Sequence, residues 1–390
     1  MKDKILDFIA TNEADMLLKL KDMVLIQSGT YNKKGIDEVL KLVMKTFQPD
    51  GLDCHVVEQK VYGNHLLVST RPSEKHDKQI LITGHVDTVF PADTDFKWFK
   101  QDEKYVYGPG VIDMKGGLVT GIYALKALAS VDILGNTPLT FVFNSDEEIG
   151  SPTSKEIIER EAKRSAFAFV LESGGINGGI VTGRKGKLGC TITVQGKAGH
   201  AAFAEHDKPS AILELSHKIL AIEGLNNLKQ GLTVNVGTIK GGISPNTIPD
   251  QAWAAADIRF NNHAERTHVK NCIEQIVQKG VVPGTCTLIE WTSERLPMEP
   301  TPGNKALYQV ADRQANELGF VVEEEYRSGV SDANIIASQK IPVIDGLGPR
   351  GARDHSKEEH MIKDSLKEKT QLLALLILES WRLYEKGTLF

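Results

Sequence analysis

Short, continuously apolar runs alternate with helical segments along most of the chain, and this alternation limits the folds open to it. The runs QILITGH (79–85), LTFVFNS (139–145) and AFAFVLES (166–173) lack the polar–apolar alternation of a half-exposed strand. Strands buried on both faces have this composition, and they occur in parallel sheets that helices cover on both sides. The sequence therefore predicts an α/β protein built on a mostly parallel sheet.

A different order of elements interrupts this alternation between residues 184 and 296. The predicted elements there run strand, helix, strand, strand, helix, strand, which is the split β-α-β order of a small ferredoxin-like domain. From residue 297 the α/β alternation returns. We therefore expect one domain of residues 1–183 plus 297–390, whose residues 15–47 are helical, and a second domain, 184–296, inserted into it.

Composition and charge exclude several classes of protein. The 390 residues are 41% apolar and 25% charged, as in ordinary globular proteins, and a net charge of −5 without a long basic run argues against nucleic acid as a partner. No stretch reaches the roughly 18 apolar residues that a membrane span requires. The four cysteines are scattered and form no CxxC pair. We therefore expect a cytoplasmic protein that binds neither nucleic acid nor membrane.

Side chains of the kinds that bind metals follow the ends of the apolar runs. His85 and Asp87 close the first run, and because side chains two apart on a strand share a face, Asp87 can fix the ring of His85. Each such residue alone is as easily a helix cap or a surface charge. In open α/β sheets, however, ligands bind outside the carboxyl ends of the strands, so these groups should gather at one edge. The other members of the set are Asp113, Glu147, Glu148, Glu172 and His355.

Six short motifs, taken together, resemble those of the M20 family of dinuclear zinc peptidases and deacylases. They are GHVDTVF, YGPGVIDMKGG, SDEEIGS, VLES, GKAGHAA and DHS, and with the inserted domain they span nearly the whole chain. The glutamate carboxypeptidase branch is the most similar. The resemblance implies a catalytic domain of the dinuclear zinc aminopeptidase type, with an inserted ferredoxin-like domain that acts as a lid. The exposed edge of such a small sheet also favours a homodimer.

The resemblance assigns a metal-binding role to five of these residues. His85 with Glu172 would hold one divalent ion, and Glu148 with His355 would hold the other. Asp113 would bridge the two. Mixed imidazole and carboxylate ligands are typical of zinc, with cobalt or manganese as alternatives.

The same resemblance implies three catalytic roles. Glu147 would be the general base, and Asp87 would orient His85. His200, in GKAGHAA, would stabilise the oxyanion of a tetrahedral intermediate, and in the relatives this histidine commonly reaches the active site of the other subunit of a dimer. These roles describe metal-assisted hydrolysis of an amide bond.

Three further residues are expected to contact the substrate. Asn246 in GGISPNTIP and Arg295 in SERLPM would hold a free α-carboxylate, the latter as a bidentate guanidinium. Gly329 lies where the relatives have a glycine-rich substrate-contacting turn. The expected substrate is a small peptide or an N-acyl amino acid.

Several functions remain open at this stage. A carboxypeptidase that releases a C-terminal amino acid such as glutamate, a dipeptidase and an N-acyl amino acid deacylase all act on substrates with a free α-carboxylate, so the sequence does not separate them. A protein that kept the fold for binding alone is the alternative from another class. Such a binding protein usually lacks a metal ligand or the general base. In this sequence, each of those positions carries a residue that can fill the role.

Overall fold

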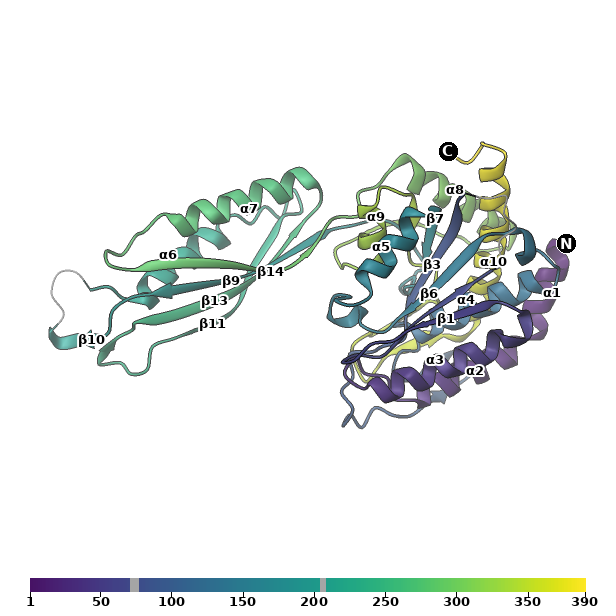
Figure 1. Cartoon of the computed structure of the whole chain (residues 1–390), viewed down its shortest axis with the longest axis horizontal. Coiled ribbons are helices and arrows are strands. Elements are labelled where there is room, and N and C mark those ends of the chain that lie inside the picture. Colours follow the sequence, from purple (N-terminus) through teal and green to yellow (C-terminus); the bar gives the residue numbers. More distant parts are fainter. Residues whose placement is uncertain (71–76, 204–207) are drawn as a thin grey trace. The chain divides into compact units, whose positions relative to one another are not determined.

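The chain divides into two units. The structure is a computed structural model, and it describes residues 1–70, 77–203 and 208–390 (Figure 1). The larger unit comprises Met1–Gly183, Pro300–Tyr326 and Ser331–Phe390. The smaller unit comprises Arg184–Glu299 and Arg327–Val330.

A six-stranded sheet forms the centre of the larger unit. Its strands, in spatial order, are β1 (Asp53–Val57), β2 (His65–Ser69), β6 (Leu139–Asn144), β3 (Gln79–His85), β7 (Ser165–Val170) and β16 (Val343–Ile344). β6, β3, β7 and β16 pair in parallel, whereas β2 runs antiparallel to both of its neighbours. The mostly parallel sheet predicted from the apolar runs is therefore confirmed. β6, β3 and β7 are buried along almost their whole length.

Helices cover both faces of this sheet. They are α1 (Lys2–Thr11), α2 (Glu13–Leu25), α3 (Lys33–Phe47), α4 (Lys115–Ala129), α5 (Lys155–Lys163), α8 (Pro302–Glu317), α9 (Asp332–Ser338) and α10 (Lys363–Glu385). Ile80 and Ile82 of β3 belong to the main apolar core, which α4 and α10 complete. Leu81, between them, is buried outside that core. Because successive side chains alternate between faces, Leu81 points toward the face that α5 covers.

The segment 15–47 is not helical throughout, contrary to the sequence-based expectation. α2 ends at Leu25 and α3 begins at Lys33, with the Asn32 side chain accepting a hydrogen bond from the Gly35 N–H as an N-cap. The residues between the helices bridge to the chain just beyond β3, where Thr30 N–H donates to the carbonyl of Thr88. The spacing of apolar residues did not reveal this break, because α2 and α3 each bury one apolar face and their apolar residues look alike in the sequence.

Glycines let α4 begin in contact with the end of β7. A Cβ on Gly117 would lie 2.0 Å from the carbonyl oxygen of Leu171, and one on Gly116 would lie 2.2 Å from that of Val111. Only glycine permits such a close approach of backbone to backbone. The approach brings Asp113, just before α4, to the strand ends that carry the other predicted ligands.

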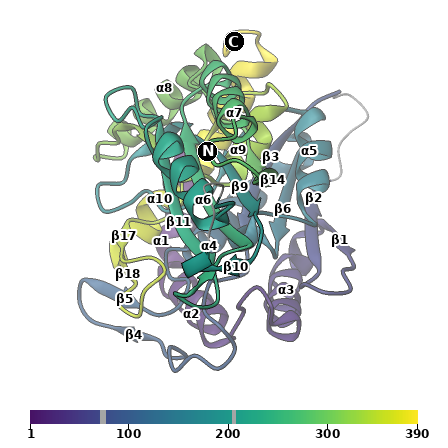
Figure 2. The same ribbon diagram turned by 90° about the vertical axis from the view of Figure 1, so that its left-hand side faces the viewer.

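The smaller unit holds a four-stranded antiparallel sheet with two helices on one face (Figures 1 and 2). The elements, in chain order, are β9 (Gly186–Gln195), α6 (Ala211–Glu223), β11 (Thr233–Gly241), β13 (Gln251–Phe260), α7 (His263–Gln278) and β14 (Cys286–Arg295). The spatial order β11-β13-β9-β14 is that of a ferredoxin-like sheet. Alternate residues of β13 are buried, as expected for a sheet with one covered face.

Short elements complete the described chain. β4 (Lys100–Gln101), β5 (Tyr105–Tyr107), β18 (His360–Ile362) and β17 (Gly351–Ala352) form a second small sheet in the larger unit. Two-stranded pairs join β8 (Ile180–Arg184) to β15 (Glu324–Arg327) and β10 (Gly199–His200) to β12 (Thr247–Ile248). The 3-10 turns are η1 (Gln48–Asp50), η2 (Leu134–Asn136), η3 (Glu147–Ile149) and η4 (Ala201–Phe203). Among the described residues, no helix is long and apolar enough to cross a membrane.

Candidate metal centre

His85 ends β3 and is held in one tautomer by Asp87. The His85 Nδ1 lies 3.0 Å from the backbone carbonyl oxygen of Asp87 and 3.3 Å from its Oδ1. A carbonyl oxygen can only accept a hydrogen bond, so Nδ1 carries the proton. In a neutral ring the lone pair is then on Nε2, which points away from Asp87.

Asp87 also fixes the turn that follows β6. It is fully buried, and its carboxylate accepts hydrogen bonds from the backbone N–H groups of Glu147 and Glu148, each at 3.3 Å. The Thr30 hydroxyl donates to its Oδ2 at 2.7 Å. One carboxylate therefore aligns His85 and the two glutamates together. Sequence reasoning missed Thr30, because its position in a connection between helices gives no signal of a contact with Asp87.

Asp113 lies between the two histidines that the sequence singled out. Its Oδ1 is 3.1 Å from His85 Nε2, and its Oδ2 is 3.0 Å from His355 Nε2. His85 comes from β3, whereas His355 comes from the loop between β17 and β18, so the two rings approach the carboxylate from separate elements. Each oxygen of Asp113 thus faces one imidazole, which is the arrangement expected of a bridging ligand.

A glutamate accompanies each histidine. Glu172 Oε1 lies 3.7 Å from His85 Nε2, and Glu148 Oε2 lies 3.4 Å from His355 Nε2. The strand order β6-β3-β7 explains part of this grouping, since parallel strands bring Glu148, His85 and Glu172 to the same edge of the sheet. The five predicted ligands therefore converge in the larger unit.

Two observations show that this set fits divalent cations. The buried Oε1 of Glu148 has no hydrogen-bond partner among the described residues. In addition, the Nε2 lone pair of His85 faces oxygens of Asp113 and Glu172. A lone pair and a carboxylate oxygen are both acceptors, so a proton or a cation is required between them. The donor atoms of His85, Asp113 and Glu148, and those of His85, Glu147 and Glu172, lie within 4.8 Å of one another. Imidazole and carboxylate donors of this kind suit zinc, cobalt or manganese.

The electrostatics of the cluster lead to the same conclusion. Hydrogen bonds to Asp113 and Glu148 raise the pKa of His355 to about 11. Burial alone would raise the pKa of Asp113, but the hydrogen bonds from His355 and His85 outweigh it and hold that pKa well below the usual range. Burial raises the pKa of Glu172 well above its ordinary value. The carboxylates thus favour positive charge at the histidines, and bound cations can replace those protons.

Two neighbours of the predicted ligands also reach the cluster. Glu147, in the η3 turn, is half-buried and groups with His85 and Glu172. Asp354 is exposed and groups with Asp113 and His355. Sequence reasoning did not single out Asp354, although it directly precedes His355 in the motif DHS.

The four remaining predicted residues belong to the smaller unit. His200 in β10 is exposed, packs against the Phe203 ring at 4.9 Å, and accepts a hydrogen bond from Ala202 N–H at Nδ1. Asn246 lies nearby, because its carbonyl accepts from Ala201 N–H at 2.9 Å. Arg295 ends β14 and is largely buried, and the carbonyl of Gly329 accepts from the Arg184 guanidinium at 2.9 Å. The role of His200 at the oxyanion and the substrate contacts of the other three residues stay predictions.

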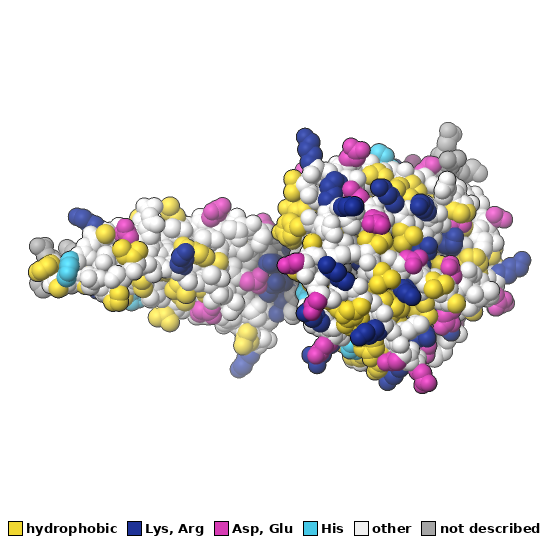
Figure 3. All heavy atoms as spheres, turned by 90° about the horizontal axis from the view of Figure 1, so that it is seen from below, with side chains coloured by type: hydrophobic (Ala, Val, Ile, Leu, Met, Phe, Trp, Pro, Cys, Tyr) yellow, Lys and Arg dark blue, Asp and Glu magenta, His cyan; other side chains and the backbone are white. Residues whose placement is uncertain are grey.

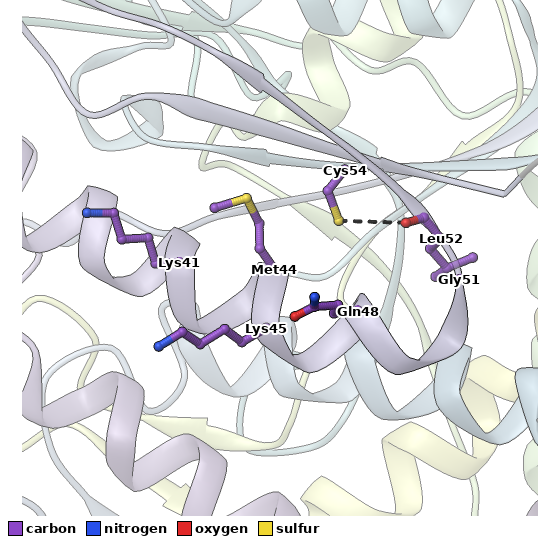
Figure 4. Close-up of a pocket in the computed structure, with 7 residues that line it drawn as sticks. All are labelled: Lys41, Met44, Lys45, Gln48, Gly51, Leu52 and Cys54. Atoms are coloured by element: carbon purple, nitrogen blue, oxygen red, sulfur yellow. Dashed lines mark hydrogen bonds between the residues drawn. The ribbon is translucent and has the colours of Figure 1, made fainter.

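A pocket elsewhere in the larger unit differs in chemistry from this cluster. It has a volume of about 480 Å³. It lies between α3 and β1, as Figure 4 shows. Its walls are made by Lys41, Met44, Lys45, Gln48, Gly51, Leu52 and Cys54. Without a carboxylate or an imidazole in its walls, it does not resemble a metal site.

Comparison with known proteins identifies the family. A family model described as "Peptidase family M20/M25/M40" matches residues 81–379, well over half of the chain. The chain belongs to this peptidase family. It is therefore a metal-dependent peptidase or amidohydrolase, and the predicted membership is confirmed. The five predicted metal ligands all fall within the matched region: His85, Asp113, Glu148, Glu172 and His355.

Individual relatives of this M20 peptidase are distant but cover most of it. Carboxypeptidase G2 from Pseudomonas sp. (strain RS-16) is 27% identical over 388 residues, which is 97% of this chain and 92% of the relative. Succinyl-diaminopimelate desuccinylase from Ectopseudomonas mendocina (strain ymp) is 28% identical over 306 residues, 74% of this chain and 79% of the relative.

A solved structure confirms the fold. Aminopeptidase PepT from Bacillus cereus ATCC 10987 superposes with a TM-score of 0.78 at 22% identity. The match covers 94% of this chain and 98% of that structure. At this level of identity the likeness concerns the fold alone, and it supports the predicted α/β architecture with its additional ferredoxin-like unit.

Proposed function

We propose that this M20 peptidase hydrolyses an amide bond and releases a C-terminal amino acid, in the manner of a glutamate carboxypeptidase. The observation that carries the proposal is Asp113 held between His85 and His355, with one glutamate beside each histidine. Distant similarity to carboxypeptidase G2 along almost the full chain supports the choice of reaction.

The proposed ligands form two overlapping sets. His85 and Glu172 would hold one divalent ion, His355 and Glu148 the other, and Asp113 would contribute one oxygen to each. Zinc is the proposed metal, because its sites commonly combine imidazole with carboxylate. Bound in this way, two cations would supply a water of lowered pKa and polarise the scissile carbonyl.

The protein's own groups supply the proton transfers. Glu147 takes a proton from the attacking water as the carbon–oxygen bond forms, and it gives that proton to the leaving amine as the carbon–nitrogen bond breaks. Asp87 serves this step indirectly, because it fixes both the ring of His85 and the backbone of Glu147. The carboxylate that leaves with the product amino acid would be bound by Arg295 and Asn246, with Gly329 beside them.

A deacylase acting on N-acyl amino acids is the second candidate, and similarity to a desuccinylase over 74% of the chain favours it. A dipeptidase is the third. The test is a comparison of kcat/KM for the zinc-loaded protein on N-blocked peptides ending in glutamate, on free dipeptides, and on N-acetyl and N-succinyl amino acids. Preference for the blocked peptides is expected. No turnover of any substrate with zinc, cobalt or manganese would overturn the proposal.

His200 is proposed to donate a hydrogen bond to the tetrahedral oxyanion. We expect His200→Ala to lower kcat by about 10²–10³-fold, the usual effect of removing one such donor. Metal content, measured by elemental analysis, should stay at two ions per chain, because the predicted ligands all lie in the larger unit. His268→Ala, at an exposed histidine on α7, is the matched control. Unchanged turnover in His200→Ala would contradict the role.

The smaller unit is also the proposed dimer interface. Its edge strand β11 and the adjoining helix α6 carry exposed apolar side chains, including Ile239 at 57% and Leu220 at 73% exposure. Figure 3 shows hydrophobic side chains exposed along this unit. An edge strand beside an apolar helix face is a surface that pairing would cover.

Sedimentation equilibrium tests the dimer directly. The wild-type protein is expected to sediment as a dimer, and Leu220→Asp to weaken association at least about tenfold, because it buries a charge in an apolar contact. Leu18→Asp, an exposed leucine on α2 of the larger unit, should leave the dimer intact. A monomeric wild type would rule the interface out.

The cytoplasm is the proposed location. All four cysteines are free thiols in the structure, which fits a reducing compartment.

A further inference from the structure

We propose that Glu359 is a positioning residue, which fixes the loop of Asp113 and ties it to the loop of His355. Its side chain is completely buried. Oε2 accepts a hydrogen bond from Gly110 N–H at 2.9 Å, and Oε1 accepts from Ile112 N–H at 2.9 Å and Asp113 N–H at 3.2 Å. Glu359 itself is not a proposed ligand. The inference rests on the metal centre proposed above, because it concerns how that centre is held.

The loop of Asp113 depends on this carboxylate for its conformation. Residues 108–114 join β5 to α4 without forming a strand or a helix of their own. Gly110 adopts a left-handed φ of +79°, so the loop turns sharply before Asp113. Buried N–H groups require acceptors, and both oxygens of the Glu359 carboxyl group act as acceptors here. Glu359 satisfies three such groups with one side chain.

The position of Glu359 in the sequence connects the two ligand loops. It follows His355 by four residues and directly precedes β18. β18 pairs with β5, with His360 opposite Tyr107, so the backbone at Glu359 lies next to the start of the Asp113 loop. Its N–H donates to the carbonyl of Ser356, one residue after His355. Glu359 is therefore part of the His355 loop through its backbone and part of the Asp113 loop through its side chain.

His355 depends on such a connection more than His85 does. The side chain of His85 is 1% exposed and is fixed by packing and by Asp87, whereas that of His355 is 55% exposed. His355 also has a left-handed φ of +59°, which few residues other than glycine adopt readily. A largely exposed ring is placed mainly by its backbone, and Glu359 anchors that backbone to the loop of the bridging ligand.

The predicted consequence is a change in metal affinity rather than in stability alone. Metal sites tolerate only a few tenths of an ångström in ligand position, and removing a group that orients a ligand typically weakens binding 10–100-fold. Glu359→Gln keeps the size of the side chain but replaces one acceptor oxygen with an NH₂ group, which sets a donor against a backbone N–H donor. We expect it to weaken binding of at least one of two zinc ions by about 10–100-fold.

Competition with a chromophoric chelator measures the two zinc affinities, and thermal unfolding with excess chelator measures stability without metal. Glu214→Gln is the matched control, because Glu214 is likewise buried and accepts hydrogen bonds from Val281 and Val282 N–H, but in the smaller unit. It should lower the melting temperature and leave both zinc affinities unchanged. Glu359→Asp keeps both acceptor oxygens on a shorter side chain, and its zinc affinities should fall between wild type and Glu359→Gln.

The outcomes separate the two proposals. Wild-type zinc affinities in Glu359→Gln, with a melting temperature lowered as in Glu214→Gln, would overturn the positioning role while leaving the metal centre intact. If Glu359→Gln does not fold, Glu359→Asp decides by the same criterion, and wild-type affinities in that variant would overturn the inference. A wild-type protein that binds no zinc would instead contradict the proposed function.

Discussion

Glu147→Gln is expected to lower kcat by about 10²–10⁴-fold while both metal ions stay bound, because a positioned general base contributes a factor of this size. The substitution keeps the shape of the side chain and removes only its ability to take a proton. KM should change little, since the proposed substrate contacts lie elsewhere. Steady-state kinetics together with elemental analysis of the same sample check the prediction.

The adjacent residue supplies the control. Glu148 faces His355, and its Oε1 has no hydrogen-bond partner in the described part of the chain, so Glu148→Gln should lose metal as well as activity. The two glutamates share one turn and one anchor, Asp87, so a general distortion of the turn would affect both variants alike. Loss of metal in Glu147→Gln, or full turnover by it, would show that Glu147 is not the base.

Asp113→Asn is expected to lose at least one metal ion and to lower kcat by at least about 10³-fold, because metal-ion catalysis contributes several kcal/mol to the transition state. One oxygen of Asp113 faces each histidine, at 3.1 Å from His85 Nε2 and 3.0 Å from His355 Nε2. An asparagine of the same size offers only one such oxygen and no charge. Metal content after dialysis and kcat at saturating zinc are the measurements.

Asp354→Asn is the control for this variant. Asp354 lies beside His355 and has an oxygen near the cluster, but it is exposed and outside the proposed ligand set. It should keep two ions and most of the activity. If Asp354→Asn lost metal as Asp113→Asn does, the assignment of ligands to the second ion would have to change.

The general architecture and the cluster itself could be predicted from local patterns. Continuous apolar runs indicated buried parallel strands, and parallel strands carry their final residues to one edge of a sheet. His85, Glu148 and Glu172 follow β3, β6 and β7 and meet for this reason. Asp113 and His355 lie in loops, where periodicity carries no information; they entered the candidate set as ligand-type residues near apolar runs, and the resemblance to the M20 family supplied their roles.

Contacts that support the cluster could not be predicted in the same way. The break between α2 and α3 was missed, and with it the approach of Thr30 to Asp87 at 2.7 Å. Glu359 was missed as well, since SKEEHM looks like a polar turn at the surface, whereas the side chain is completely buried. In both cases the partner lies far along the chain, so no local spacing indicates the contact.

The sequence by itself determined the order of the elements and the types of side chain at the strand ends, because burial on both faces and the chemistry of metal ligands restrict residue type locally. Only the tertiary structure decided which oxygen faces which imidazole and which buried groups hold the ligand loops in place. These depend on pairings between distant segments, such as β18 with β5 and Glu359 with the Asp113 loop, and on how closely backbones can pack where glycines begin α4.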